Sequence, residues 1–190
     1  DMEPSDEAGQ LAATLARRNN QDLWESNAVT AAAATHAVVF LEALGQPDDQ
    51  NRTKLSDNAL QTAEIVAEHI ARNRPASELM QTLLAGIERG SPELSAIVAR
   101  GLLAGWPRDY RLQSTDVMEA SLLRLLEQIE PPSKSRLLRL ASLCGSTALE
   151  TRAKEIVTSL LKVVSDTDSI PATRVNAAQE AVGFQSEDIE

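Results

Sequence analysis

Apolar residues recur every three to four positions along most of this chain, and this helical spacing limits the fold more than any other feature. In the stretch 148–164, for example, Leu149, Ile156 and Leu160 fall on one stripe of a helix, whereas Lys162 lies off it. Gly and Pro number only eight each, and aromatic residues make up 3% of the chain, which argues against a sandwich or a barrel. We therefore predict an all-α protein.

Start and stop signals divide the chain into successive helices. Ser, Asp or Pro opens most of them, and Gly or Pro closes several. One boundary lacks both Gly and Pro, and there we place a turn near Thr35-His36. The expected helices are 5–18, 22–34, 37–45, one from Asp57, one from Pro75 or Ser77, one from Pro92, 116–129, one from Ser133 or Ser135 to Gly145, 148–164, and one from Pro171.

Helix starts near Asp57, Pro92, Ser133 and Pro171 recur every 35–41 residues. This interval lies between the tetratricopeptide period of about 34 and the HEAT/armadillo period of about 40–47. The two Trp residues do not recur as a tetratricopeptide repeat requires. We therefore predict a HEAT/armadillo-like α-α superhelix, a right-handed solenoid of about four and a half helical hairpins that fills residues 1–190 as one domain.

Charge is unevenly distributed along the chain, whose formal net charge is −10. Residues 1–70 hold 4 basic and 12 acidic side chains, residues 71–165 hold 13 and 10, and residues 166–190 hold 1 and 6. Binding to nucleic acid phosphates needs a broad cationic field, so we expect no nucleic acid partner. The slightly basic segment 71–165 argues against such a partner less strongly than the two acidic ends do. No apolar stretch reaches 18 residues, so we expect no membrane span in this segment.

Residues that carry chemistry are few. Cys144 is the single cysteine, which rules out an internal disulfide and Cys-based zinc or haem motifs, and its place on an apolar stripe predicts a packed thiol. His36 and His69 lack further ligands at helical spacing, so we interpret them as solvent-facing or turn residues. No glycine-rich phosphate loop, HExxH or GxSxG motif occurs. We predict no catalytic residue, cofactor or metal.

Three short polar segments resemble ligand or modification motifs only superficially. The runs 166–169 and 48–51 offer oxygen ligands but lack the Gly and terminal Glu of an EF-hand loop, so ordinary turns are favoured. Asn51-Arg52-Thr53 matches a glycosylation acceptor, a pattern short enough to arise by chance.

The loop after residue 105 is a candidate partner contact because it combines aromatic and Arg side chains, namely Trp106, Arg108, Tyr110 and Arg111. The favoured alternative is that Trp106 fills the core between two hairpins. A second candidate is a basic region that holds Arg136 and Arg139 together with Arg124 and Lys134, for which a solvated helix face is the favoured alternative.

A solenoid would present a concave surface lined by the second helix of each hairpin. We place these helices at 76–89, 116–129 and 147–165. The side chains expected to be exposed on them for recognition are Gln81, Glu88, Glu119, Glu127 and Lys162.

Several helix-packing segments resemble a known family. They are Gly101–Pro107, Leu122–Leu126, Ser135–Ala141 and Gly145-Ser146, with Asp22–Trp24 and Phe40–Leu44 upstream. They are similar to a HEAT-like segment in large proteins of planctomycetes and verrucomicrobia, named as membrane-bound dehydrogenases or c-type haem-binding proteins. The likeness spans most of residues 20–190.

In that family the segment is a spacer between a propeller-like dehydrogenase domain and a cytochrome c domain. The resemblance therefore implies a larger parent, a redox-active dehydrogenase or cytochrome that is periplasmic or otherwise exported. This chain lacks a Cys-x-x-Cys-His motif and propeller repeats, so the resemblance implies no activity for these 190 residues.

The sequence thus predicts a non-catalytic module that binds a protein partner or spaces neighbouring domains of the same chain. Two alternatives stay open. One is a HEAT-like enzyme of the DNA glycosylase or chromophore lyase type, which the net charge disfavours. The other is a self-associating structural module, because an unfinished array would expose an apolar end near 175–184.

Overall fold

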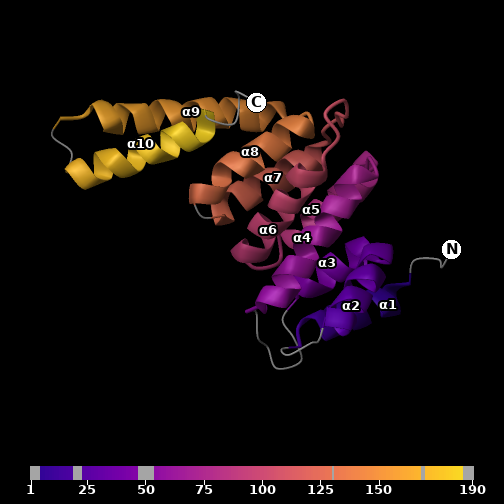
Figure 1. Ribbon diagram of the computed structural model, residues 1–190. Helices are drawn as coiled ribbons and strands as arrows, with labels where there is room; N and C mark the ends of the chain where they lie inside the picture. Colours follow the sequence, from indigo (N-terminus) through magenta and orange to yellow (C-terminus); the bar gives the residue numbers. More distant parts are fainter. Residues whose placement is uncertain (1–4, 19–22, 47–53, 130, 168–169, 186–190) are drawn as a thin grey trace.

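The computed structural model describes residues 5–18, 23–46, 54–129, 131–167 and 170–185, and within these ranges it contains ten α-helices and no strand (Figure 1). The all-α prediction is confirmed. So is the turn between the second and third helices, whose axes differ by 108°. The helices are α1 (Asp6–Ala16), α2 (Leu23–Thr35), α3 (Ala37–Gly45), α4 (Asp57–Arg72), α5 (Ser77–Ile87), α6 (Pro92–Gly105), α7 (Asp116–Gln128), α8 (Pro131–Leu143), α9 (Thr147–Ser165) and α10 (Pro171–Gln185).

Most helices pack against the helix two places along the chain. α4, α6, α8 and α10 follow one another in this way, and so do α3, α5, α7 and α9. At the N-terminal end α1 packs on α3 and α2 packs on α4, which continues both series. These contacts between second neighbours are more extensive than those between most sequential neighbours, such as α2 with α3 or α6 with α7.

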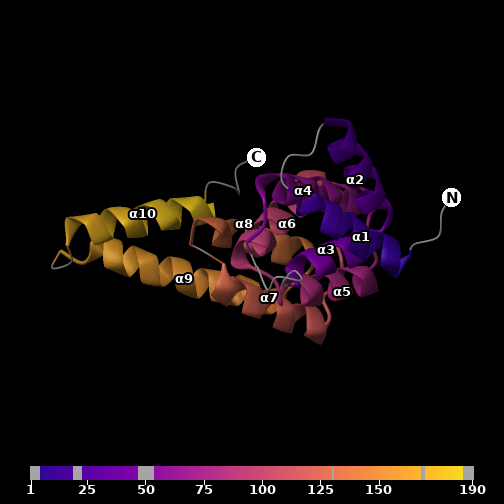
Figure 2. The same cartoon turned by 90° about the horizontal axis from the view of Figure 1, so that it is seen from below.

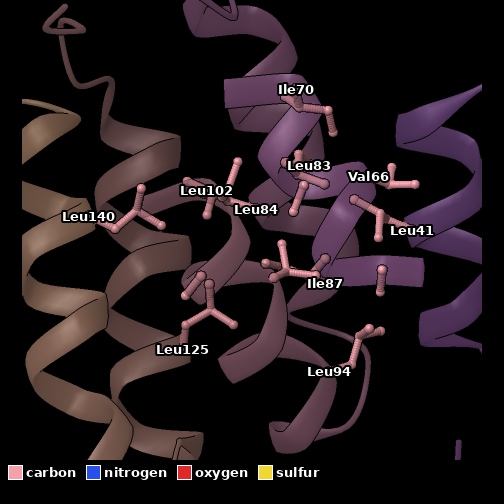
Figure 3. Close-up of a cluster of buried hydrophobic side chains, with 14 of the residues drawn as sticks. Leu41, Val66, Ile70, Leu83, Leu84, Ile87, Leu94, Leu102, Leu125 and Leu140 are labelled. Atoms are coloured by element: carbon pink, nitrogen blue, oxygen red, sulfur yellow. The ribbon is translucent and has the colours of Figure 1, made fainter. Parts of the chain in front are cut away.

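Apolar side chains from α1 through α9 form one buried cluster, and Figure 3 shows the part of it between Leu41 and Leu140. Leu83, Leu84 and Ile87 of α5 lie at its centre, between Leu41 of α3 and Leu102 of α6. The i, i+3, i+4 spacing of the α5 residues places all of them on one face. The core therefore runs along the array and joins its successive helices.

The most extensive helix contact in the described ranges is between α4 and α6, and it includes two glycines of α6. A Cβ atom on Gly101 would lie 2.9 Å from Cβ of Ala67 and closer still to the carbonyl oxygen of Glu64. A Cβ atom on Gly105 would likewise collide with the backbone of Glu68. The absent side chains let the backbone of α6 rest directly on α4, and we call this contact the glycine seam.

Hydroxyl side chains cap the starts of five of the described helices. Ser5, Ser56, Ser91, Thr115 and Ser146 accept a hydrogen bond from a first-turn N–H of α1, α4, α6, α7 and α9, respectively. Asp57 and Asp116, which the sequence pattern favours as caps, are instead the first helical residues. There their negative charge favours the helix N-terminus.

The boundaries of α8 agree with the predicted boundaries at one end only. The helix begins at Pro131, before the predicted start at Ser133 or Ser135, because proline is well suited to the first turn. It ends at Leu143, and Gly145 is the predicted stop residue just after it: this residue has a φ of 73°, and the N–H of Ser146 donates back to the carbonyl of Ala141 at 2.9 Å. This pair of features is the Schellman motif, which favours glycine at this position.

Two Arg–Glu pairs fasten neighbouring helices with the same geometry. Arg100 of α6 donates through two nitrogens to Glu64 of α4, both at 2.5 Å. Arg124 of α7 donates in the same way to Glu88, at the end of α5, at 2.6 and 3.0 Å. Each pair spans 36 residues. Hydrogen bonding from Arg124 lowers the pKa of Glu88, and the Glu64 carboxylate raises the pKa of Arg100.

The last two helices, α9 and α10, lie side by side and project from the rest of the molecule in both views (Figures 1 and 2). Leu149 enters the core at the base of this hairpin, and Ala177 and Ala181 of α10 are buried. Leu161 is 48% exposed, although it belongs to the cleanest apolar stripe in the sequence. The stripe is less buried than expected because α10 alone covers the far part of α9, and it offers small side chains.

Candidate interaction surface

The loop between α6 and α7 is tied down through its aromatic residues. Trp106 is 8% exposed, and its indole N–H donates to the carbonyl oxygen of Tyr110 at 2.9 Å. The phenol of Tyr110 donates to the carbonyl oxygen of Pro75 at 2.7 Å, and the two rings lie 5.8 Å apart. The structure thus places Trp106 in the core, where the packing interpretation expects it, and the loop braces the α4–α5 turn.

Charged residues reinforce this brace. Arg74, in the α4–α5 turn, pairs with Asp109 at 2.7 Å and lies over the ring of Tyr110 at 5.9 Å. Arg111 donates to the carbonyl oxygens of Arg108 and Tyr110 at 3.2 and 2.9 Å, so it stabilises the loop conformation. Arg108 and Arg111 are both exposed. They are the two residues of the predicted loop contact that stand on the surface.

The predicted basic region lies on α8 and α7. Arg136 and Arg139 are exposed on α8, but the charge of Arg124 is paired with Glu88. The end of α8 meets the loop, because the N–H of Leu112 donates to the carbonyl oxygen of Leu143 at 3.1 Å. Arg136 lies about two helical turns from that junction. Arg108, Arg111, Arg136 and Arg139 are the exposed arginines of the two predicted contact regions, and we call them together the arginine surface.

Three of the five side chains expected to carry recognition on the second helices are engaged within the molecule. Gln81 accepts a hydrogen bond from Thr115 at 3.0 Å, Glu88 holds Arg124, and Glu119 accepts one from Ser146 at 2.6 Å. Glu127 and Lys162 are exposed, as expected. Periodicity places a side chain on a face, but it does not show that the next helix supplies a partner there.

The single thiol and the two histidines occupy distinct settings. Cys144 is buried as predicted, and burial raises the pKa of its thiol to about 12. His36 lies in the α2–α3 turn, as one interpretation holds, but it is only 5% exposed. His69 is exposed on α4. Across the described residues, no group of three or more His, Cys, Asp or Glu side chains is placed to hold a metal ion.

The other polar segments fall wholly or partly outside the described residues: 48–51 and Asn51-Arg52-Thr53 wholly, and 166–169 at its last two positions. In the described part of the chain, no single helix has both the length and the apolar character to cross a membrane. The bent pair α2 and α3 meets that test only when the two helices are taken together.

The sequence did not indicate that His36 and His69 lie near each other, but the structure places them in one region. Both line one hollow between the α2–α3 turn and the α4–α5 turn. Their separation of 33 residues is close to the 34–36 residues that separate several contacts between neighbouring helices. That spacing is the signal that could have indicated their proximity.

Comparison of the chain with protein-family models, curated proteins and solved structures finds no match. The class that the structure defines is therefore an all-helical protein of ten described helices, packed mostly through second neighbours. The family resemblance remains a prediction.

Proposed function

We propose that this chain is a non-catalytic HEAT-like α-solenoid that serves as a protein-interaction scaffold or as a spacer between domains. Contacts that recur at nearly constant sequence separation carry this proposal. In each of the two Arg–Glu pairs, Glu64–Arg100 and Glu88–Arg124, the two residues are 36 positions apart in the sequence. Three loop contacts span 35, 36 and 34 residues: Tyr110 to Pro75, Ser77 to Gln113, and Thr115 to Gln81.

A constant separation is what stacked repeats produce, because each repeat contacts its neighbours through equivalent positions. The starts of α4 and α6, 35 residues apart, agree with this period, whereas the next two intervals, from α6 to α8 and from α8 to α10, are longer at 39 and 40 residues. A stack of hairpins in which each one is rotated by the same small angle relative to the one before forms a superhelix, and we propose that this superhelix is right-handed. The proposed parent is a larger, exported redox protein, and support for it comes from the family resemblance alone.

The arginine surface is the proposed contact for a protein partner or a neighbouring domain. Arg is enriched at protein interfaces, and these side chains are exposed on the α6–α7 loop and on α8. The whole chain is acidic, with a net charge of −10. A partner with an acidic patch would therefore be attracted to the arginine surface and repelled by the acidic surfaces elsewhere.

Site-specific photo-cross-linking tests the scaffold proposal. A photoreactive residue replaces Arg108, Arg111 or Arg136 in the source cells, and Arg72 on α4 serves as the exposed control position. We expect one protein to cross-link from the three surface positions and to be lost when the remaining arginines are changed to Glu. Equal cross-linking from Arg72, or none from the surface, contradicts the proposed surface.

The reading frame around this segment tests the proposed parent separately. A flanking propeller and a Cys-x-x-Cys-His motif would support it, whereas their absence would remove the redox parent and leave the scaffold standing. A DNA mobility shift that weakens with salt would instead favour the glycosylase-type alternative.

One observation favours the self-associating alternative. Ile170, Val175 and Val182 are exposed by more than half at the α9–α10 hairpin, and Leu161 by nearly half. Sedimentation over a range of concentrations decides the matter: a dimer that Val175→Ser and Val182→Ser abolish would support self-association, and a monomer throughout would exclude it.

A further inference from the structure

Two side chains of different chemistry fasten the first helix, α1, to the rest of the chain. Near the end of α1, the guanidinium of Arg17 donates to the carbonyl oxygens of Leu44 and Gln46 at 2.9 and 2.6 Å. At the start of α1, Nδ1 of His36 accepts a hydrogen bond from the backbone N–H of Ser5 at 2.9 Å. A guanidinium keeps its charge in proteins, whereas an imidazole gains or loses a proton between about pH 5 and 8. Of these two fastenings, only the one at Ser5 can therefore respond to pH in that range.

The hydrogen bond at Ser5 requires an uncharged imidazole. A backbone N–H can only donate, so Nδ1 of His36 must offer a lone pair and the ring proton must lie on the other nitrogen. A second proton would occupy Nδ1 and turn the acceptor into a donor, so that two N–H groups would face each other. Because His36 is only 5% exposed, water cannot hydrate a charged ring unless the chain that covers it moves.

The first turn of α1 is the part of the chain that covers this histidine. Ser5 is exposed, and its hydroxyl caps α1 by accepting from the N–H of Ala8 at 3.4 Å. Further along the same turn, a Cβ atom on Gly9 would lie 2.8 Å from Cβ of Val39 and 3.3 Å from Cβ of His36. The backbone of α1 thus rests directly on the start of α3. Lifting this turn would bring both the imidazole and Val39 into water.

Charged groups near His36 also come from α4 and from the α4–α5 turn. His69 and Arg74 line the same hollow as His36, and Arg74 opposes a further positive charge there. Its ion pair with Asp109, at 2.7 Å, offsets part of this repulsion. Among the described residues that line the hollow, those of α2, α3 and α5 are uncharged and none is a carboxylate. A protonated His36 would therefore find no counter-charge in the wall of the hollow.

The two helix ends at His36 act in opposite directions. His36 is the N-cap residue of α3, and the positive partial charge of a helix N-terminus disfavours a cation at that position. Asp6 and Glu7, in the first turn of α1, would attract a positive imidazole. Both are exposed, so water screens their attraction, and neither restores an acceptor to the N–H of Ser5. Protonation thus removes the hydrogen bond without replacing it.

We propose that His36 is a pH-sensitive latch for the start of α1. The uncharged imidazole holds the first turn of α1 on α3, and the protonated imidazole releases it, while Arg17 keeps the end of α1 in place. The hydrogen bond exists only with the uncharged ring, so the turn is held most firmly at the alkaline end of the histidine range and loosens as the pH falls. This device is independent of the proposed scaffold function, since none of its residues belongs to the arginine surface.

Amide hydrogen exchange of the full chain, followed by NMR from about pH 8 to about pH 5.5, tests the latch. Acidic side chains normally titrate near about pH 4, so this range isolates the histidines. The N–H of Gly9 donates to the carbonyl oxygen of Ser5 at 3.1 Å and reports on the first turn. We expect its protection factor to fall about tenfold, as loss of one hydrogen bond predicts, with the same midpoint as the titration of the His36 imidazole. The amide of Leu84, in the core of α5, should keep its protection.

Three results would overturn the latch. The first is a Gly9 amide that stays protected while the His36 imidazole takes up its proton. The second is a His36 imidazole that remains uncharged at about pH 5.5 with the turn still in place. The third is an equal loss of protection at Leu84, which would indicate unfolding of the whole chain.

Variants of the two histidines identify the group that responds. In His36→Asn the side-chain oxygen takes the place of Nδ1 as an acceptor but does not titrate, so Gly9 should be equally protected at both ends of the pH range. His69→Asn is the matched control, because His69 is exposed, and this variant should keep the pH dependence of the parent chain. A dependence that survives in His36→Asn, or disappears in His69→Asn, contradicts the assignment. If His36→Asn does not fold, the parent chain decides: the Ser5 amide proton must shift with the same midpoint as the His36 imidazole.

Discussion

The glycine seam between α4 and α6 allows a quantitative test of how the array is held together. In Gly101→Ala the new methyl group would lie 2.9 Å from Cβ of Ala67, whereas ordinary contacts begin at 3.4 Å. The helices must therefore separate by at least about 0.5 Å, and the carbonyl oxygen of Glu64 demands more. A main-chain oxygen cannot rotate out of the way as a flexible side chain can.

The expected loss of stability follows from two opposing terms. Overpacking of a tight core costs about 1–3 kcal/mol, and the rigid backbone neighbour places Gly101→Ala in the upper part of that range. Alanine regains about 1 kcal/mol of helix propensity relative to glycine. The net loss is therefore about 1–2 kcal/mol, and each kcal/mol lowers Tm by about 2–4 °C in a domain of this size.

Gly105→Ala should behave in the same way because it meets the backbone of Glu68 in the same seam. Once the helices have separated for one methyl group, the second enters at little cost, so the double variant should lose less stability than the sum of the singles. Gly45→Ala is the matched control, since its Cβ would meet its nearest neighbour at 3.4 Å in another helix.

Urea unfolding followed by far-UV circular dichroism measures all four variants. A Gly101→Ala chain as stable as Gly45→Ala, or losses in the double variant that add fully, would refute this account of the seam.

Three further outcomes are expected. Arg124 lowers the pKa of Glu88, so the pair stabilises the fold fully above the ordinary carboxyl pKa of about 4.3, and this stability is lost as the pH falls through the lowered pKa. In Glu88→Gln, the midpoint of urea unfolding should therefore change less than in the parent chain when the pH is lowered from 7 to about 3. Cys144, buried and with a raised pKa, should resist a thiol reagent at mildly alkaline pH and react fully in urea, and rapid native labelling would contradict its burial. Tyr110→Phe removes the bond to the carbonyl oxygen of Pro75 and should cost about 1 kcal/mol in the same urea assay, while an unchanged midpoint would show that the loop braces nothing.

Helix identity and most boundaries follow from the sequence because they depend on local patterns. The turn at Thr35-His36 lies where it was predicted, although neither Gly nor Pro marks it and the Ala-rich segment before it has no apolar stripe that would define the boundary. The end of α8 just before Gly145 was predictable because glycine suits the left-handed position that follows the helix there. These signals involve residues within about four positions of one another.

Features that depend on the next helix could not be predicted in this way. The sequence gives Glu88 and Glu119 an exposed face of their helices, but only the packed structure shows Arg124 and Ser146 opposite them. Leu161 is the reverse case. Its position on an apolar stripe predicts burial, but the neighbouring helices leave the side chain 48% exposed. Burial is a property of neighbours, and the pattern within one helix does not specify them.

The hollow at His36 depends on long-range proximity even more strongly. Ser5, His36 and Arg74 meet there from three separate parts of the chain. Each of them alone has an ordinary interpretation as a cap, a turn residue or a surface charge. Their combination became visible only when the turns of neighbouring hairpins were placed side by side.

The α9–α10 hairpin also has a mechanical consequence, because it is held to the rest of the molecule near one end. With 19 residues, α9 is about 28 Å long. A rotation of only about 10° near Leu149, at its base, would move the far tip by roughly 5 Å over such a length. The hairpin therefore acts as a lever that converts a small change in side-chain packing against α7 and α8 into a large displacement at its tip, where Ile170 is exposed.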